Sequence, residues 1–401
     1  MNKMTVRDVE ISGRRVLVRV DFNVPLDEAT GAITDDSRIK ATRPTLTYLI
    51  DGGARTILCS HLGRPGGKVV EKLRLGGVRQ RLSQLLGKEV AMTRDCIGPE
   101  VEEAVAGMKD GDVLLLENVR FHPGEEKNDP AFARALARLA DIYVNNAFGA
   151  LHRSHASIVG ITAYLPAVAG LLVERELEVL GKILSSPPRP FAALTGGAKV
   201  SDKIELLENI MDKVDCLLIG GGMAATFLKA LAYEVGRSLV ENDKLGLTGR
   251  LMNDAAQQGA RLLLPLDVVV AREINARAES LTVPVEGIPP GMRIVDIGPR
   301  TVKSFSEELR KCRTVFWNGP MGVYEIARFA GGTRAMAELL AGLKAATIIG
   351  GGSTAEVVTE MKLVDRMRFV STGGGASLRF LGGETLPGVE ALRNKEASGS
   401  G

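Results

Sequence analysis

The sequence predicts an α/β protein in which two domains are each built on a parallel β-sheet. Its 401 residues exceed what one hydrophobic core normally supports and fit two domains of ordinary size. Short runs of β-branched and apolar residues recur along the whole chain and alternate with stretches of helical periodicity. Strands that alternate with helices form βαβ units, whose strands are parallel.

The expected strands are short, and many of them end at glycine or polar residues. In the first half they are Val16–Val20, Thr56–Cys59, Val113–Leu116 and Ile142–Val144. In the second half they are Phe191–Leu194, Cys216–Ile219, Leu262–Leu264, Val268–Val270, Thr314–Trp317, Thr347–Ile349 and Arg368–Val370. The clearest helical stretches are Pro130–Ala140, Leu171–Leu184, Asp202–Asp212 and Asp243–Gln258. We expect the strands of each half to form a parallel sheet.

An amphipathic helix followed by a proline-rich segment marks the expected domain boundary. Residues 172–190 contain VERELEVLGKIL and then SSPPRP. Proline stops a helix and stiffens the entry into the next strand. We therefore expect a first domain over residues 1–171, a hinge helix and connector over residues 172–190, and a second domain over residues 191–385.

Composition excludes several classes of protein. A net charge of +3 and an aromatic content of 4% give no general affinity for polyanions and no stacking surface for nucleic acid. The uncharged stretch Ser154–Val173 is interrupted by Pro166, glycines and polar residues, so no membrane span is expected. The four cysteines form no C-x-x-C pair and the N-terminus lacks an apolar stretch, which favours a cytoplasmic enzyme with reduced thiols.

Three expected strand-to-helix turns of the second half are rich in glycine. They are LLIGGGMAATFL, IIGGGSTAEV and STGGGASL. Glycine lets a phosphate approach the N–H groups at a helix start, so we expect a phosphate site there. Two turns also fit the dinucleotide pattern, which keeps a dehydrogenase as a second hypothesis that titration with NADH would test. After Gly350, however, Val370 and Ser371 stand where that pattern requires an acid.

Polar and basic side chains of the first half follow the expected strands. They are Asp21, Asn23, Arg38, His61, Arg64, Arg120 and Arg153. The carboxyl ends of parallel strands meet at one sheet edge, where ligands bind. Four arginines converging there would repel one another without an anion, and the guanidinium fork suits phosphate.

A zinc site is not expected. None of the four histidines has a cysteine or an HExxH partner in the sequence, as zinc sites usually require. We interpret His152 and His155 as loop residues with structural hydrogen bonds.

Over essentially the full length and in the same order, the motifs resemble those of the phosphoglycerate kinase family. The matching segments are VRVDFNVP, SHLGRP, LLLENVRFHPGEEKND, NNAFGALHRSHAS, GGAKVSDKI, LLIGGGMAATFL, WNGPMGVYE, IIGGGSTAEV and STGGGASL. The resemblance implies two Rossmann-like domains with parallel sheets joined by a hinge helix, and residues 386–401 packing back on the first domain. It also implies that the first domain binds the acid and the second binds the nucleotide.

The implied reaction converts 1,3-bisphosphoglycerate and MgADP to 3-phosphoglycerate and MgATP, in glycolysis and gluconeogenesis, with Mg²⁺ bound to the nucleotide. The implied acid-binding residues are Asp21, Asn23, Arg38, His61, Arg64, Arg120 and Arg153. The implied nucleotide-binding residues are Lys199, Lys203, Asn318, Glu325, Gly350, Gly351, Gly352, Ser353, Thr354 and Ala355. The implied catalytic groups are Arg38, Lys203, Gly373 and Gly374, which closure about the hinge would align. We expect a monomer.

One position departs from the family pattern. Where members commonly carry an acid that serves the nucleotide-bound Mg²⁺, this chain has Ser353, a weaker and neutral ligand. No metal ligand is therefore assigned from the sequence. A catalytically silent homologue that binds nucleotide is the alternative function, although Arg38, Lys199, Lys203 and Glu325 are retained.

Overall fold

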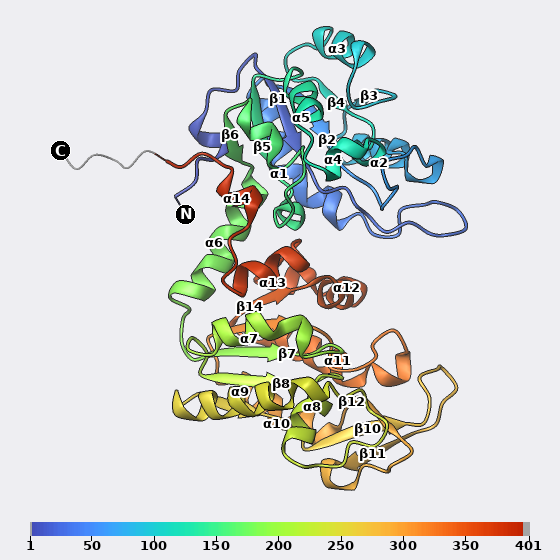
Figure 1. Ribbon diagram of the computed structural model, residues 1–401, viewed down its shortest axis with the longest axis vertical. Coiled ribbons are helices and arrows are strands. Elements are labelled where there is room, and N and C mark those ends of the chain that lie inside the picture. Colours follow the sequence, from blue (N-terminus) through green and yellow to red (C-terminus); the bar gives the residue numbers. More distant parts are fainter. Residues whose placement is uncertain (1, 396–401) are drawn as a thin grey trace, which may run out of the picture. The chain divides into compact units, whose positions relative to one another are not determined.

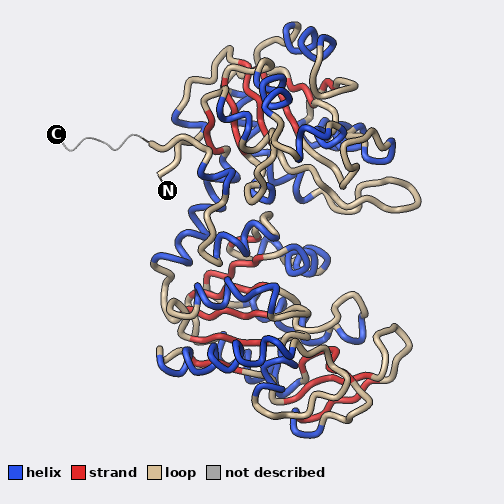
Figure 2. Tube along the Cα trace, viewed as in Figure 1, coloured by secondary structure: helices blue, strands red, loops and turns tan. Residues whose placement is uncertain are grey.

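The computed structural model describes residues 2–395 and divides the chain into two compact units. Unit 1 comprises residues 2–178 and 385–395, and unit 2 comprises Val179–Glu384. The boundary falls inside helix α6 (Leu171–Ser185), within the segment predicted to connect the domains. In each unit helices lie on either side of the strands (Figures 1 and 2).

The sheet of unit 1 contains six parallel strands in the order β3-β4-β2-β1-β5-β6. The strands are β1 (Arg15–Arg19), β2 (Arg55–Cys59), β3 (Ala91–Met92), β4 (Val113–Leu115), β5 (Ile142–Asn145) and β6 (Ala167–Ala169). The sequence predicted β1, β2, β4 and β5, and these predictions are confirmed. It missed β3 and β6, which are short and rich in alanine, a residue that is depleted in strands.

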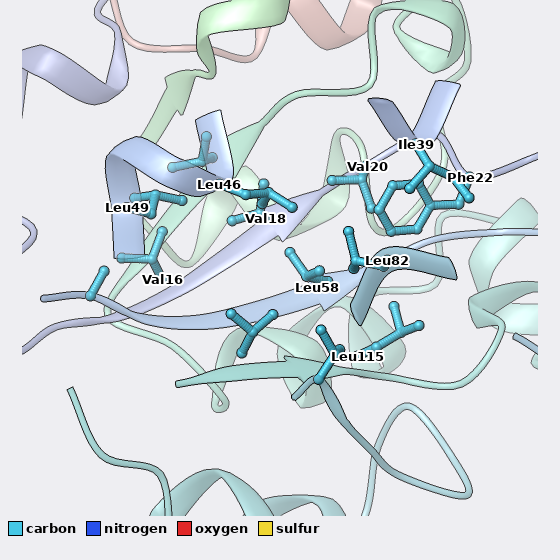
Figure 3. Close-up of a cluster of buried hydrophobic side chains, with 14 of the residues drawn as sticks. Val16, Val18, Val20, Phe22, Ile39, Leu46, Leu49, Leu58, Leu82 and Leu115 are labelled. Carbon is cyan, nitrogen blue, oxygen red and sulfur yellow. The ribbon is translucent and has the colours of Figure 1, made fainter. Parts of the chain in front are cut away.

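The helices of unit 1 are α1 (Ser37–Asp51), α2 (Gly76–Leu86), α3 (Pro99–Ala106), α4 (Pro123–Glu126), α5 (Pro130–Ala137) and α14 (Pro387–Glu390). Strand β1 illustrates how the hydrophobic core of unit 1 forms. Val16, Val18 and Val20 alternate along the chain and so share one face of the sheet, where they pack with Leu46 and Leu49 of α1 (Figure 3). The intervening residues face the opposite side.

The last described residues complete unit 1. Met4 N donates to Arg393 O at 2.8 Å, and Gly388 N donates to Leu151 O at 2.9 Å. Ala169 N, in β6, donates to Met4 O at 2.9 Å. These hydrogen bonds join both ends of the described chain to the edge of the sheet. The predicted packing of residues 396–401 lies outside the described residues.

The main sheet of unit 2 contains six parallel strands in the order β15-β14-β13-β7-β8-β9. The strands are β7 (Phe191–Thr195), β8 (Cys216–Ile219), β9 (Arg261–Leu263), β13 (Thr314–Asn318), β14 (Ala346–Gly350) and β15 (Phe369–Val370). The helices are α7 (Ile204–Ile210), α8 (Ala224–Ala230), α9 (Leu245–Gln257), α10 (Pro299–Leu309), α11 (Gly331–Gly342), α12 (Gly352–Glu360) and α13 (Gly375–Leu381). All six strands were predicted from the sequence. The fold class, α/β with two parallel sheets, is confirmed.

A second, antiparallel sheet of unit 2 was not predicted. It consists of β11 (Ser280–Pro284), β10 (Asp267–Ala271) and β12 (Arg293–Ile297), in that order. The prediction that Val268–Val270 belongs to the parallel sheet is therefore wrong. An apolar run indicates a strand, but the direction of its neighbours depends on pairing between distant segments.

No helix in the described part of the chain combines the length and apolar character that a membrane crossing requires.

Candidate active site

The predicted acid-binding residues of unit 1 follow strands that are neighbours in the sheet. Strands β4, β2, β1 and β5 lie side by side and run parallel, so their carboxyl ends meet at one edge. The loops beyond them carry Asp21 and Asn23 after β1, His61 and Arg64 after β2, Arg120 after β4, and Arg153 after β5. Arg38 lies in the first turn of α1.

Arg19, the last residue of β1, is a buried guanidinium that the sequence analysis did not single out. Its Nε donates to Ser157 Oγ at 2.8 Å, and its Nη2 lies 3.1 Å from His61 Nδ1. Glu125, also fully buried, accepts from the backbone N and the Oγ of Ser157 at 2.8 and 2.6 Å. This carboxylate offsets the buried positive charge through Ser157 and holds Arg19 in place.

His61 is neutral and has a defined tautomer. Burial lowers its pKa well below the usual value, and the charges of Arg19 and Arg120 lower it further. A guanidinium only donates hydrogen bonds, so Nδ1 facing Arg19 must accept and the ring proton lies on Nε2. His61 therefore presents one fixed N–H donor.

Arg120 and Arg153 lie close to other positive charges. The pKa of Arg120 is lowered to about 10 by burial and by the charges of Arg153 and Arg19. The pKa of Arg153 is lowered by burial, Arg19 and Arg64, and its buried Nη1 has no hydrogen-bond partner among the described residues. We call Arg19, Arg120 and Arg153 the arginine cluster. Positive charges gathered in this way favour an anion between them.

The other predicted acid-binding residues differ in their contacts. Arg38 pairs with Asp21 through Nη1 and Oδ2 at 2.5 Å. Asn23 Oδ1 accepts from Gly63 N at 2.8 Å, so this side chain joins the loops after β1 and β2. Arg64 is exposed.

His152 and His155 lie beside the arginine cluster. His152 Nε2 accepts from Arg153 Nε at 3.3 Å. The pKa of His155 is lowered to about 4 by burial and by the charges of Arg120 and Arg153. Both residues therefore experience the charges of the arginine cluster, and their interpretation as loop residues with structural hydrogen bonds stays a prediction.

In unit 2 the predicted nucleotide-binding segments follow β7, β13 and β14, which are adjacent parallel strands. Lys203 is buried, and its Nζ donates to Asn318 O at 3.1 Å and also to Asn318 Oδ1. Asn318 Nδ2 donates to Gly350 O at 2.6 Å. The side chain of Asn318 thus joins the ends of all three segments. Lys199 and Glu325 are exposed.

Burial lowers the pKa of Lys203 to about 8, and only Asp202 opposes this effect. Few negative charges offset the buried charge of the Lys203 ammonium group, so the group is suited to binding an anionic ligand. The negative charge of such a ligand would raise the pKa of Lys203 again.

Two glycines are required by the close approach of these segments. A Cβ at Gly319, where φ is +93°, would lie 2.3 Å from Gly196 O and 2.9 Å from Lys203 Nζ. A Cβ at Gly351, where φ is +95°, would lie 2.6 Å from Asn318 Nδ2. Only glycine avoids both the left-handed strain and the overlap.

Gly350 ends β14, and α12 begins at Gly352, with Ser353, Thr354 and Ala355 in its first turn. The first N–H groups of a helix have no partner within the helix, and they attract anions. Thr354 Oγ1 accepts a hydrogen bond from Gly319 N at 2.7 Å. In the turn before α13, Gly373 N donates to Ser371 Oγ at 3.1 Å, and Gly374 has a φ of +50°.

Two acidic residues that position these loops were missed. Glu241 accepts from Val200 N at 2.6 Å and from Ser201 N at 3.1 Å, which anchors the segment that bears Lys199 and Lys203. Glu356 of α12 accepts from the hydroxyl of Tyr324 at 2.9 Å. Their contacts join segments far apart in the sequence, so no local pattern indicates them.

A family model, phosphoglycerate kinase, matches residues 6–384. The chain belongs to the phosphoglycerate kinase family. Phosphoglycerate kinases of Moorella thermoacetica and Pelotomaculum thermopropionicum are each 55% identical to it over 395 residues, which cover 98% of this chain and 100% of each relative.

Two solved structures of phosphoglycerate kinases are similar to this chain over almost its whole length. Phosphoglycerate kinase from Coxiella burnetii has a TM-score of 0.86 at 40% identity, and that from Pyrococcus horikoshii has 0.86 at 31% identity. Each comparison covers 97% of this chain and 98% of the other. The chain is therefore a phosphotransferase of glycolysis that reversibly transfers a phosphoryl group between 1,3-bisphosphoglycerate and ADP.

Proposed function

We propose that unit 1 binds the phosphorylated three-carbon acid and that unit 2 binds ADP or ATP. The observation that carries the first assignment is the arginine cluster, in which the charges of Arg153 and Arg19 lower the pKa of Arg120 and the charge of Arg19 lowers the pKa of Arg153. The substrate of this enzyme is an anion of the kind that relieves such repulsion. Asp21, Asn23, Arg38, His61 and Arg64 complete the proposed acid site.

The chemistry explains why no general base is needed. In the ATP-consuming direction, a carboxylate oxygen of 3-phosphoglycerate forms a bond to the γ-phosphorus while the bond from that phosphorus to the bridging oxygen of ADP breaks. The attacking carboxylate is already ionised at neutral pH. Catalysis therefore depends on alignment and on stabilising the charge of the moving phosphoryl group. We assign this role to Arg38, Lys203, Gly373 and Gly374.

The activity itself is tested by a coupled assay that follows ATP-dependent consumption of 3-phosphoglycerate. We expect turnover that requires both substrates. A chain that binds nucleotide but consumes neither substrate would support the silent homologue instead.

Hydrogen exchange tests which unit binds which ligand. We expect 3-phosphoglycerate alone to slow exchange in residues 21–38, 60–64 and 119–122 of unit 1. MgADP alone should slow exchange in residues 196–203, 318–325 and 350–355 of unit 2, because bound ligands suppress local opening. The antiparallel sheet of β10–β12 is the internal control. Protection of the unit 1 segments by MgADP, with none in unit 2, would contradict the assignment.

We propose that Mg²⁺ reaches the enzyme with the nucleotide and is held mainly by phosphate oxygens and water. Ser353 supplies a neutral oxygen near the start of α12. Among the described residues, the only three His, Cys, Asp or Glu side chains close enough to share an ion are Asp95, Cys96 and His122 of unit 1, so the described part of unit 2 holds no group of three such ligands. Mg²⁺ commonly keeps several waters and takes few protein ligands, and the residues present fit that mode.

Replacement of Ser353 by aspartate should tighten the binding of Mg-nucleotide, because a carboxylate is a stronger Mg²⁺ ligand than a hydroxyl. Mg²⁺ titrations of activity at fixed nucleotide would compare wild type with Ser353→Asp, and Ser353→Ala is the matched control. We expect wild type and the alanine variant to require similar Mg²⁺ concentrations. If wild type already matches the aspartate variant, another protein carboxylate holds the metal and the assignment is wrong.

The monomeric state and the cytoplasmic location stay predictions. Sedimentation equilibrium would measure the first, and fractionation of the source cells the second.

A further inference from the structure

A cluster of three metal-ligating side chains lies in unit 1, apart from the residues assigned above. The carboxylate of Asp95, the thiol of Cys96 and the imidazole of His122 each place one donor atom within 4.8 Å of the others. Asp95 and Cys96 belong to the loop between β3 and α3, and His122 follows the 3₁₀ helix Val119–Phe121. Cys96 is buried, whereas the side chains of Asp95 and His122 are 54% and 28% exposed.

The donors are held in place by local contacts. Thr93 Oγ1 donates to Asp95 O at 2.6 Å, and Cys96 N donates to Asp95 Oδ1 at 2.6 Å. The His122 ring stacks on Phe132 with centroids 5.2 Å apart, and its Nε2 lies 2.6 Å from Asp95 Oδ1. The ring and the loop are therefore already oriented, so a metal would order little additional chain.

We propose that Asp95, Cys96 and His122 form a binding site for a zinc-class transition-metal ion. One thiolate, one imidazole and one carboxylate are ligands that Zn²⁺ accepts. Three protein ligands leave a fourth tetrahedral position for water. The site differs in place and in chemistry from the nucleotide-bound Mg²⁺, which prefers oxygen ligands.

The charges and protons balance. Without metal, burial and the negative charge of Asp95 raise the pKa of the Cys96 thiol well above its usual value, so Cys96 is protonated. Binding of Zn²⁺ releases that proton. It also replaces the hydrogen bond between His122 Nε2 and Asp95 Oδ1: the ring proton leaves Nε2, Nδ1 carries the ring proton instead, and Nε2 coordinates the metal. The bound group is then neutral, with one divalent cation against one thiolate and one carboxylate. The exposed edge of Asp95 and His122 provides the route by which the ion arrives.

A zinc site was not expected from the sequence because no local zinc-binding motif is present. Cys96 and His122 are far apart in the sequence, and neither belongs to a C-x-x-C or HExxH pattern. The connection between β3 and α3 brings Cys96 beside His122 only in the folded chain. Because Arg120 lies in the 3₁₀ helix directly before His122, bound metal would also stiffen the backbone next to the arginine cluster.

Calorimetric titration of Zn²⁺ into the chelator-treated full chain tests the site. We expect one tight Zn²⁺ per chain, and more than about 100-fold weaker binding in Cys96→Ser and in His122→Asn, beyond the usual effect of losing a residue that only orients a ligand. Cys312→Ser is the matched control, because Cys312 is a partly buried thiol outside the cluster. Unchanged binding in both cluster variants would overturn the proposal.

Cobalt provides an independent readout that does not depend on the stability of Cys96→Ser. Co²⁺ added to wild type should produce sulfur-to-cobalt charge-transfer absorption, which Zn²⁺ should abolish by displacement. His122→Asn, which changes a partly exposed side chain, should lose the tight Co²⁺ complex while keeping its far-ultraviolet circular dichroism. A wild-type cobalt spectrum without the sulfur band would show that Cys96 is not a ligand and would refute the site.

Discussion

Replacing Arg38 with alanine should lower kcat by about 10²–10³-fold, which corresponds to about 2.7–4 kcal/mol of transition-state stabilisation. Arg38 lies at the start of α1 and pairs with Asp21 at 2.5 Å. This ion pair holds the guanidinium in one orientation before substrate arrives, so charge stabilisation needs little reorganisation during the reaction. A group that acts mainly on the moving phosphoryl should affect kcat more than KM.

Steady-state kinetics with both substrates varied would separate the two effects. Arg43→Ala is the matched control, because Arg43 is an exposed arginine of the same helix, and its loss should leave kcat unchanged. If Arg38→Ala keeps a normal kcat and only raises KM for 3-phosphoglycerate, Arg38 binds the acid without stabilising the transferred charge.

The sequence predicted the parallel strands and the residues beyond them because both depend on local patterns. Runs such as Cys216–Ile219 identify buried strands, and residues that follow parallel strands must lie at the carboxyl edge of the sheet. The placement of Arg120 and Arg153 beside one another follows from this rule, together with the strand order.

Local patterns of this kind could not predict contacts between segments that are distant in the sequence. Arg19 lies inside an apolar run, and only its alternation with Val18 and Val20 indicates that it faces away from their core. That Asn318 lines the nucleotide pocket stays a prediction, and no local pattern indicated that its side chain also joins Lys203 to Gly350. Which partner a buried polar group chooses depends on the packed tertiary structure, because each group must find whatever donor or acceptor lies nearby.

Replacing Lys203 with methionine should also lower activity by about 10²-fold or more, the effect of losing one preorganised group that stabilises developing charge. Lys203 Nζ is held by both oxygens of Asn318 in a buried position. In the wild type the pKa of Lys203 is lowered to about 8, so the ammonium group loses its proton as pH rises above 8. The kcat/KM of the wild type should fall over the same range, because kcat/KM reports the ionisation of the free enzyme. The bound phosphates raise the pKa, so the corresponding fall in kcat should occur at higher pH.

Lys203 should also make the free energy of unfolding depend on pH. Its pKa is about 8 in the folded chain and 10.5 as the ordinary value, so the unfolded state binds more protons between these two pH values. Stability of the wild type should therefore rise with pH across this window, by up to about 3 kcal/mol. Below pH 8 the folded chain carries the full penalty of a buried charge.

Methionine keeps the apolar stem but cannot titrate, so it removes this pH dependence. Denaturant unfolding of ligand-free wild type and Lys203→Met from pH 7 to 10.5 would give the difference in free energy of unfolding at each pH. We expect wild type to gain stability relative to the variant as pH rises. Lys199→Met is the control, because Lys199 is an exposed lysine of the same segment. A difference that stays constant across the window would mean that Lys203 is not desolvated in the free enzyme. In that case the buried ammonium group of Lys203 would not lower the stability of the free enzyme.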